Sequence, residues 1–250
     1  MKSSLLIGIA LFLASSCEKE NTLKKVDDVC TKMEDSNFMK YCYDNFDVNK
    51  DGMVSMQEAA AVKRISFSSS STTSLKGIEY FTTITYLYCE CILTSLDVSK
   101  NTQLTELYCF DNNLTSLDVS KNTQLTKLYC SDNNLTSLDV SKNTQLTKLY
   151  CDYNNLTSLD VSKNTQLTLL GCQNNNLTSL DVSKNTQLTY LSCSDNNLTS
   201  LDVSKNLSIR SDGLACKQNC PITVFYSANQ PIEEWKSEYY YSSNITWILK

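Results

Sequence analysis

The chain contains no histidine and very little glycine or proline. Its 250 residues include 5 Gly and 2 Pro, and its net charge of −5 is spread without a basic region. The absence of histidine removes the commonest general base and the commonest metal ligand, which excludes Ser-His and Cys-His catalysis. With so little Gly and Pro, the turns must be made by Asn, Asp and Ser. We therefore expect no enzyme activity and no nucleic-acid partner.

Long hydrophobic runs are also absent, and the one apolar run near the N-terminus is short. It falls well below the ~20 residues that span a bilayer, so it predicts a signal peptide over residues 1–16. Small residues directly before Cys17 resemble the cleavage site of bacterial lipoproteins, in which that cysteine carries a lipid. Ordinary cleavage leaving a free Cys17 is the alternative. We expect a lipid anchor on Cys17, a tether over residues 17–29, and a position in the outer membrane or at the cell surface, with a periplasm-facing one still open.

An acidic segment, DVNKDGMVSMQE, occupies residues 47–58. Its oxygen-bearing positions have the spacing of a calcium-binding EF-hand loop: Asp47, Asn49, Asp51, the carbonyl of Met53, and Glu58 as the bidentate ligand. Apolar residues at helical spacing flank the loop and predict a helix on each side. They are Phe38, Cys42 and Phe46 before it and Ala59, Val62 and Ile65 after it. An acidic surface turn is the alternative. Because no second loop is present, we expect weak binding of calcium in a structural role.

One nine-residue phrase, LTSLDVSKN, occurs six times at intervals of 21 residues, with the first copy beginning at Leu93 and the last at Leu198. A period of this length indicates a solenoid of stacked coils, which offers an extended surface rather than a catalytic pocket. Between the copies, the pattern LxxLxCxxN alternates inward Leu and Cys with outward residues, as a strand does. The repeated phrase has a similar alternation. Greater variability of the outward positions favours LxxLxCxxN as the strand.

A column of cysteines accompanies the leucines at positions 89, 109, 130, 151, 172 and 193, joined by Cys216. Stacked parallel strands would place these thiols in a line ~4.8 Å apart, which does not suit tetrahedral zinc or a unique disulfide pairing. We expect them to fill the core as small hydrophobic side chains. A Cys30–Cys42 bridge, or one that involves Cys220, stays open.

Taken together, these motifs resemble the leucine-rich-repeat family. The cysteine-bearing repeat of 21 residues is similar to the repeats of internalin J-like bacterial surface proteins, and its combination with a short EF-hand resembles exported lipoproteins of Bacteroides-type bacteria. The resemblance implies an α/β leucine-rich-repeat solenoid with parallel strands on one concave face, an irregular convex side, and a small helical EF-hand cap. The expected parts are an N-terminal cap over residues 30–66, the solenoid over 67–219 and a C-terminal cap over 220–250.

The outward positions of the predicted strands vary between copies, which gathers the variation on a single face. The residues predicted to bind a partner there are Tyr88, Tyr108, Tyr129, Tyr150, Lys127, Lys148 and Phe110. Tyrosine contributes strongly to interfaces, so we predict a monomeric cell-surface protein that mediates protein–protein interaction or adhesion. The alternative function is glycan binding as an accessory of surface nutrient uptake. The alternative interpretation of the rings is that stacked tyrosines only shield the sheet.

Overall fold

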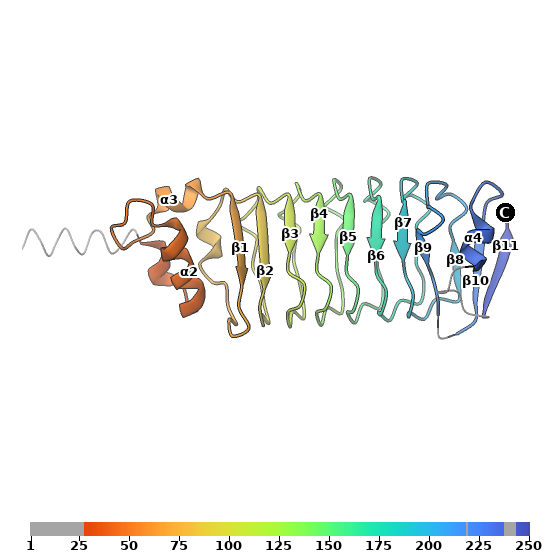
Figure 1. Ribbon diagram of the computed structural model, residues 1–250, viewed down its shortest axis with the longest axis horizontal. Coiled ribbons are helices and arrows are strands. Elements are labelled where there is room, and N and C mark those ends of the chain that lie inside the picture. Colours follow the sequence, from red (N-terminus) through yellow and green to blue (C-terminus); the bar gives the residue numbers. More distant parts are fainter. Residues whose placement is uncertain (1–27, 219, 238–243) are drawn as a thin grey trace, which may run out of the picture.

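The computed structural model of the protein describes residues 28–218, 220–237 and 244–250 (Figure 1). The predicted signal peptide, Cys17 and most of the predicted tether lie outside the described residues, as do residues 238–243 of the predicted C-terminal cap. Within the described part of the chain, no helix is long and apolar enough to cross a membrane.

A parallel sheet runs along the length of the molecule (Figure 1). Its strands, in spatial order, are β1 (Arg64–Ser68), β2 (Tyr86–Glu90), β3 (Glu106–Tyr108), β4 (Lys127–Tyr129), β5 (Lys148–Tyr150), β6 (Leu169–Gly171), β7 (Tyr190–Ser192) and β9 (Leu214–Ala215). Equivalent residues of successive copies pair across neighbouring strands, as Leu128 does with Leu149. The leucine-rich-repeat solenoid is therefore confirmed, and the strand lies in LxxLxCxxN as predicted.

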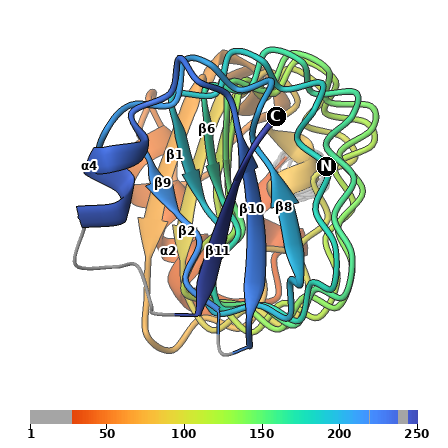
Figure 2. The same ribbon diagram turned by 90° about the vertical axis from the view of Figure 1, so that its right-hand side faces the viewer.

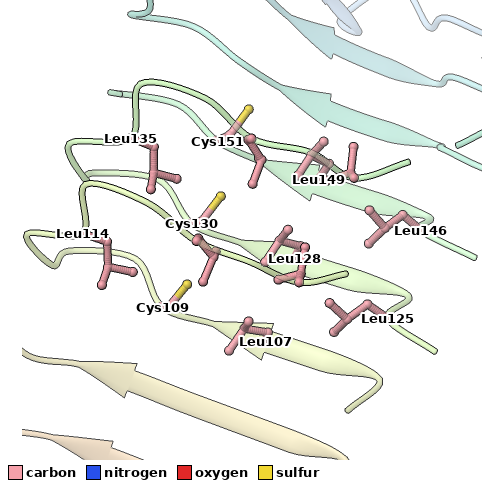
Figure 3. Packing of buried hydrophobic residues seen from close by; sticks show 14 of the residues in the cluster. Leu107, Cys109, Leu114, Leu125, Leu128, Cys130, Leu135, Leu146, Leu149 and Cys151 are labelled. Atoms are coloured by element: carbon pink, nitrogen blue, oxygen red, sulfur yellow. The ribbon is translucent and has the colours of Figure 1, made fainter. Parts of the chain in front are cut away.

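Leucine, cysteine and valine side chains fill the interior of each coil (Figure 3). In one coil, Leu128 and Cys130 point inward from the strand and Val140 points inward from the repeated phrase, and all three are fully buried. The sulfurs of Cys109, Cys130 and Cys151 lie one above another and point the same way. Burial raises the pKa of these three thiols well above its usual value. They therefore stay protonated and pack as small apolar groups.

Two columns of buried asparagine tie the coils together. In the first column, which follows the strands, Asn133 accepts a hydrogen bond from Leu114 N at 2.9 Å and donates to Cys109 O at 2.9 Å. In the second column, at the end of the repeated phrase, Asn143 Nδ2 donates to Val119 O and Asn122 O. The Oδ1 of Asn143 and of its equivalents has no hydrogen-bond partner among the described residues. Both columns satisfy backbone carbonyls of neighbouring coils, but only the first uses all of its own polar atoms.

The N-terminal cap consists of η1 (Val29–Lys32), α2 (Ser36–Phe46), α3 (Met56–Ala61) and η2 (Ile78–Tyr80). Asp35 caps α2 by accepting hydrogen bonds from Asn37 N and Phe38 N, and Phe38 is buried on the predicted face. The prediction that Ile65 continues the helix after the loop is wrong. Helix α3 ends at Ala61, and Ile65 lies buried in β1, where it pairs with Leu87.

Two boundaries of the predicted parts also differ from the structure. Strand β1 begins at Arg64, so the solenoid sheet starts inside the segment assigned to the cap. Asp28 and Val29, which we placed in the tether, are 4% and 3% exposed. They pack on the cap, because Val29 N donates to Val54 O at 2.9 Å.

A second, three-stranded sheet closes the C-terminal end, which faces the viewer in Figure 2. It pairs β8 (Ser200–Asp202), β10 (Ile222–Tyr226) and β11 (Ile245–Leu249), and α4 (Ile232–Ser237) packs beside it. Strands β10 and β11 and helix α4 lie within the segment 220–250 that was predicted to cap the solenoid. Strand β8 was not predicted, because it lies in the last copy of the repeated phrase, which becomes a strand where β10 offers it a partner.

Candidate functional site

The outward side chains of the long sheet form one surface, which we call the strand face. In β4, for example, Leu128 is buried while Lys127 and Tyr129 on either side are partly exposed. The same alternation holds in β3 and β5. The variable residues of the repeat are therefore gathered on one side of the molecule, as the sequence predicted.

Three tyrosines of adjacent strands stack on the strand face, and we call them the tyrosine ladder: Tyr108, Tyr129 and Tyr150. Their ring centroids lie 4.6 and 4.9 Å apart, with planes 18° from parallel. Burial raises the pKa of all three phenols, and Tyr108 also donates a hydrogen bond to Glu106 at 2.9 Å. The rings thus present an ordered, half-buried apolar ridge with hydroxyl groups.

Tyr88 does not extend this stack, although the register places it beside Tyr108. Its ring centroid lies 6.4 Å from that of Tyr108, its hydroxyl donates to Glu90, and its ring meets Phe110 edge-on at 5.5 Å. Tyr86 lies closer to Tyr108, at 5.3 Å. Of the four tyrosines predicted on this face, three therefore stack, and Tyr88 forms a separate aromatic pair with Phe110.

One of the two lysines predicted to bind a partner has its positive charge neutralised by a neighbouring carboxylate. Lys127 forms an ion pair with Glu106 at 3.0 Å. Burial works to raise the pKa of Glu106, but the hydrogen bonds from Lys127 and Tyr108 outweigh it and the pKa is lowered. Lys148 forms no ion pair among the described residues, so it supplies the positive charge beside the ladder.

Sequence reasoning missed one contributor at the N-terminal end of the ladder, Arg64. The guanidinium of Arg64 lies 3.7 Å from the ring centroid of Tyr86, a cation–π contact. Arg64 was overlooked because its segment was assigned to a helix. The pairing of β1 with β2 is the signal that finds it, since it aligns Arg64 with Tyr86.

Gly171 ends the ladder on its other side. A Cβ at this position would lie 2.7 Å from Tyr150 Cδ1 and 2.6 Å from Asp152 Oδ2. Those side chains lean over the glycine, so no further side chain can stack on Tyr150 from β6. The row of outward positions that carries the tyrosine ladder therefore continues with small residues, Gly171 in β6 and Ser192 in β7.

The predicted calcium loop places its acidic residues against its own backbone. Asp47 accepts hydrogen bonds from Asp51 N and Gly52 N at 3.1 and 2.9 Å, and Glu58 accepts from Val48 N and Ser55 N at 2.9 Å. These contacts, first among them those with Ser55, lower the pKa of Glu58. Gly52 takes the sharp turn with φ +82°. Within the described residues, no three acidic, Cys or His side chains are grouped as a metal cluster.

The apolar residue of the loop has a partner inside the chain. Val54 is fully buried, its N–H donates to Asp28 Oδ1 at 3.1 Å, and its carbonyl accepts from Val29 N. Asp28 also accepts a hydrogen bond from the hydroxyl of Tyr43 at 2.7 Å. The segment at Asp28 therefore holds the end of the loop against the N-terminal cap.

The repeated phrase uses its exposed polar groups within its own turns. Asp118 accepts a hydrogen bond from Ser120 N, and the same contact recurs in the other copies at 2.8 to 3.0 Å. This contact with the serine lowers the pKa of Asp118. Turn formation therefore explains why an Asp recurs two residues before a Ser in every copy.

Comparison with known proteins supports the repeat assignment. The family model described as leucine-rich repeats (2 copies) matches residues 102–143 and 123–164, and a second leucine-rich-repeat model matches residues 173–191. No curated protein sequence matches the chain. Residues 102–164 and 173–191 are thus leucine-rich repeats.

Several solved structures resemble the chain. An internalin C2 from Listeria monocytogenes is 17% identical with a TM-score of 0.64, and the match covers 90% of this chain and 97% of that one. A leucine-rich-repeat protein of Leptospira interrogans is 16% identical with a TM-score of 0.52, over 72% of this chain and 59% of that one. The functional domain of InlJ from Listeria monocytogenes, described as including a cysteine ladder, is 30% identical with a TM-score of 0.42. That match covers 80% of this chain, which spans 56% of the InlJ domain. The first two likenesses support the solenoid fold.

Proposed function

We propose that the protein is a non-catalytic, exported leucine-rich-repeat protein whose strand face binds a protein partner at the cell surface. The observation that carries this proposal is the contrast between the two halves of the repeat. The outward residues of the repeated phrase are invariant, and among them the Asp shapes the turn, whereas those of the strands vary and present stacked tyrosines. Variation on an ordered aromatic surface is what partner recognition needs.

The tyrosine ladder and its neighbours form the proposed contact surface. Tyrosines supply large contact area at low entropic cost, and they are common among residues that dominate binding energy. Phe110 and Tyr88 widen the apolar surface on one side. Lys148 adds a positive charge, which favours a partner with acidic residues near its own apolar contact.

The decisive experiment replaces Tyr108, Tyr129 and Tyr150 together with Ser. Wild-type protein and variant are compared for capture of proteins from an extract of candidate host or bacterial cell surfaces. A matched control replaces Thr115, Thr136 and Thr157 with Ser on the opposite half of the same coils, where they are exposed. We expect capture to be lost in the tyrosine variant only. Equal capture by all three proteins, with folding intact by circular dichroism, would reject the strand face as the binding surface.

Glycan binding is the second candidate function, because tyrosine rings also stack on sugar rings. A glycan array probed with the same proteins separates the two functions. Binding to an array, lost in the tyrosine variant, would replace the protein partner with a saccharide.

The loop over residues 47–58 is proposed as a structural calcium site. Its donors are all oxygens, supplied by Asp47, Asn49, Asp51, Met53 and Glu58, which suits calcium. We expect millimolar calcium to raise the melting temperature, and Glu58→Gln to abolish the increase. Asp44→Asn is a suitable control because Asp44 pairs with Lys40 outside the loop. A melting temperature that does not change with calcium or chelator would contradict the site.

Membrane attachment through Cys17 completes the proposal. It is tested by incorporation of a labelled fatty acid during expression in a bacterium that processes lipoproteins. Incorporation in the wild type and its loss in Cys17→Ser would support the anchor, and an unlabelled wild-type protein would exclude it.

A further inference from the structure

A pocket opens on the strand face between β6 and β9, beyond the end of the tyrosine ladder. Its volume is about 580 Å³, within the ~300–1,000 Å³ typical of ligand sites. The residues around its rim are Tyr153, Gln173, Asn174, Tyr190, Asp195 and Lys217. None of them belongs to the tyrosine ladder.

The pocket exists because the outward residues become small where the ladder ends. After Tyr150, the equivalent positions are Gly171, Ser192 and Ala215. The coil geometry also changes here. Leu170 pairs with Leu191, 21 residues on, but Leu191 pairs with Leu214, 23 residues on. Ser192 is only 3% exposed and lies among the pocket residues, so the hollow has a buried polar floor.

Tyr190 forms one aromatic side of the pocket. The equivalent position in the next coil is Gly213, just before β9, where a Cβ would lie 2.3 Å from Thr189 O, so no side chain can cover the ring from there. Among the described residues, Tyr190 makes no ring contact with another aromatic side chain. Its ring therefore differs from those of the ladder, whose faces cover one another.

Tyr153 forms the other aromatic side, at a backbone position that does not favour tyrosine. Its φ is +53°, in the left-handed region, and the equivalent residues of other copies are Asp111, Asp132, Asn174 and Asp195. Asp and Asn tolerate this conformation, whereas a bulky side chain is strained in it. Tyr153 is 50% exposed and makes no aromatic contact among the described residues. Folding does not explain the choice of tyrosine, and strain of this kind is often retained where a ligand binds.

The polar groups between the two rings are mixed in kind and in charge. Gln173 Oε1 accepts a hydrogen bond from Ser192 Oγ at 3.0 Å, which fixes the amide while its Nε2 makes no hydrogen bond among the described residues. Asn174 adds a second amide. Two carboxylates, Asp195 and Asp212, line the pocket together with Lys217, and Asp212 pairs with Arg210 at 3.4 Å. Because both signs of charge are present, an anion and a cation would each meet a like charge.

We propose that this pocket binds a neutral hexose unit of a saccharide. A sugar ring has an apolar face of C–H groups, which suits the ring of Tyr190 or Tyr153, and hydroxyl groups that both donate and accept. Amides and a carboxylate match those hydroxyls. The pocket uses none of the residues of the tyrosine ladder, so this proposal and the proposed protein interaction can fail independently.

The test uses the full chain and the methyl glycosides of glucose, galactose, mannose and N-acetylglucosamine as probes. Saturation-transfer NMR detects their binding at millimolar affinity. The test variants are Tyr190→Ser and Tyr153→Asn, and the second restores the residue type that suits φ +53°. Tyr129→Ser is the matched control, because it removes a tyrosine of the strand face outside the pocket.

We expect at least one neutral probe to bind, with affinity reduced about tenfold or more in both pocket variants and unchanged in the control. Tyr153→Asn should keep or raise the melting temperature, which separates binding from folding. The proposal is overturned if no probe binds the wild type, or if both pocket variants bind as the wild type does. Tighter binding of glucosamine or glucuronic acid than of the neutral probes would also overturn it.

Discussion

The two halves of each repeat bury similar numbers of apolar side chains but use their remaining residues differently. The strand half buries Leu and Cys and follows them with an asparagine whose polar atoms are all bonded. The repeated phrase buries Leu and Val and ends on an asparagine with an unpaired oxygen. The outward side chains of the strand half contact other side chains, whereas the outward Asp of the repeated phrase accepts a hydrogen bond from the backbone of its own turn. Sequence invariance therefore marks the half that shapes the coil, and variation marks the half that is free to specialise.

The largest expected difference between the halves appears at alkaline pH. The ladder thiols have raised pKa values when folded, so the unfolded state loses protons more readily. Their contribution to stability is complete below the ordinary thiol pKa near 8.5 and is lost as the pH rises above it. At pH 9.5, each fully buried thiol should lower the free energy of unfolding by roughly 1 kcal/mol.

Urea unfolding at pH 7.5, 8.5 and 9.5 measures this loss. Replacing Cys130 and Cys151 with Ala should reduce the pH dependence, whereas Val140→Ala in the other half should lower stability equally at every pH. An identical pH dependence in the wild type and the cysteine variant would contradict the buried, protonated ladder.

The two asparagine columns should differ next. Asn133→Leu leaves Leu114 N–H buried without an acceptor and should cost about 3 kcal/mol or more. Asn143→Leu should cost less, about 1–2 kcal/mol, because Val119 O and Asn122 O keep the backbone donors Asn122 N and Leu125 N. Denaturant midpoints in matched urea titrations compare the two. The reverse order would show that the unpaired oxygen of Asn143 is better satisfied than its contacts indicate.

A smaller effect is expected on the surface of the strand half. Tyr129→Ser removes two stacked contacts, each worth roughly 0.5–1.5 kcal/mol. Thr136→Ser, exposed in the repeated phrase of the next coil, should be nearly neutral. Thermal melting of both variants tests the difference. If Tyr129→Ser is as neutral as the control, the stack does not stabilise the fold.

The smallest effect should come from the exposed aspartates of the repeated phrase. The hydrogen bonds from the serines lower the pKa of Asp118, Asp139 and Asp160. This contribution is present above the ordinary carboxyl pKa near 4 and is lost as the pH falls through the lowered value. Replacing the three with Asn keeps an acceptor for the turn but removes the titration. The variant should therefore lose slightly less stability than the wild type between pH 5 and 2.5, measured by melting temperature.

Local periodicity was enough to predict the coils. Leu128 and Cys130 alternate with Lys127 and Tyr129, so the strand and its buried side follow from neighbouring residues alone. Ile65 shows where this fails. Its spacing from Val62 suits a helix, but pairing of β1 with β2 decides the outcome, and that pairing depends on residues about 20 positions away. Strand β8 was missed for the same reason.

The details of the candidate site were less predictable. The alternation of inward and outward positions placed Tyr88 and Lys127 on the correct face. Ring orientation and ion pairing, however, depend on which neighbouring side chains each residue contacts. The hydroxyl of Tyr88 donates a hydrogen bond to Glu90, and Lys127 forms an ion pair with Glu106 in the preceding strand. The pocket beside Tyr190 depends on the altered offset of β9, which repeat periodicity cannot reveal because the repeat has already degenerated there.

The uniform asparagine contacts also bear on how this chain can change in length. Asn122, Asn143 and Asn164 each donate to two carbonyls of the preceding copy, at equivalent positions and distances of 2.8 to 3.0 Å. Loss or gain of 21 consecutive residues would rejoin the same surfaces, so a duplication or deletion within the coding sequence leaves both ends of the molecule intact. Copy number can therefore drift in whole units, and each step adds or removes one row of variable residues on the strand face.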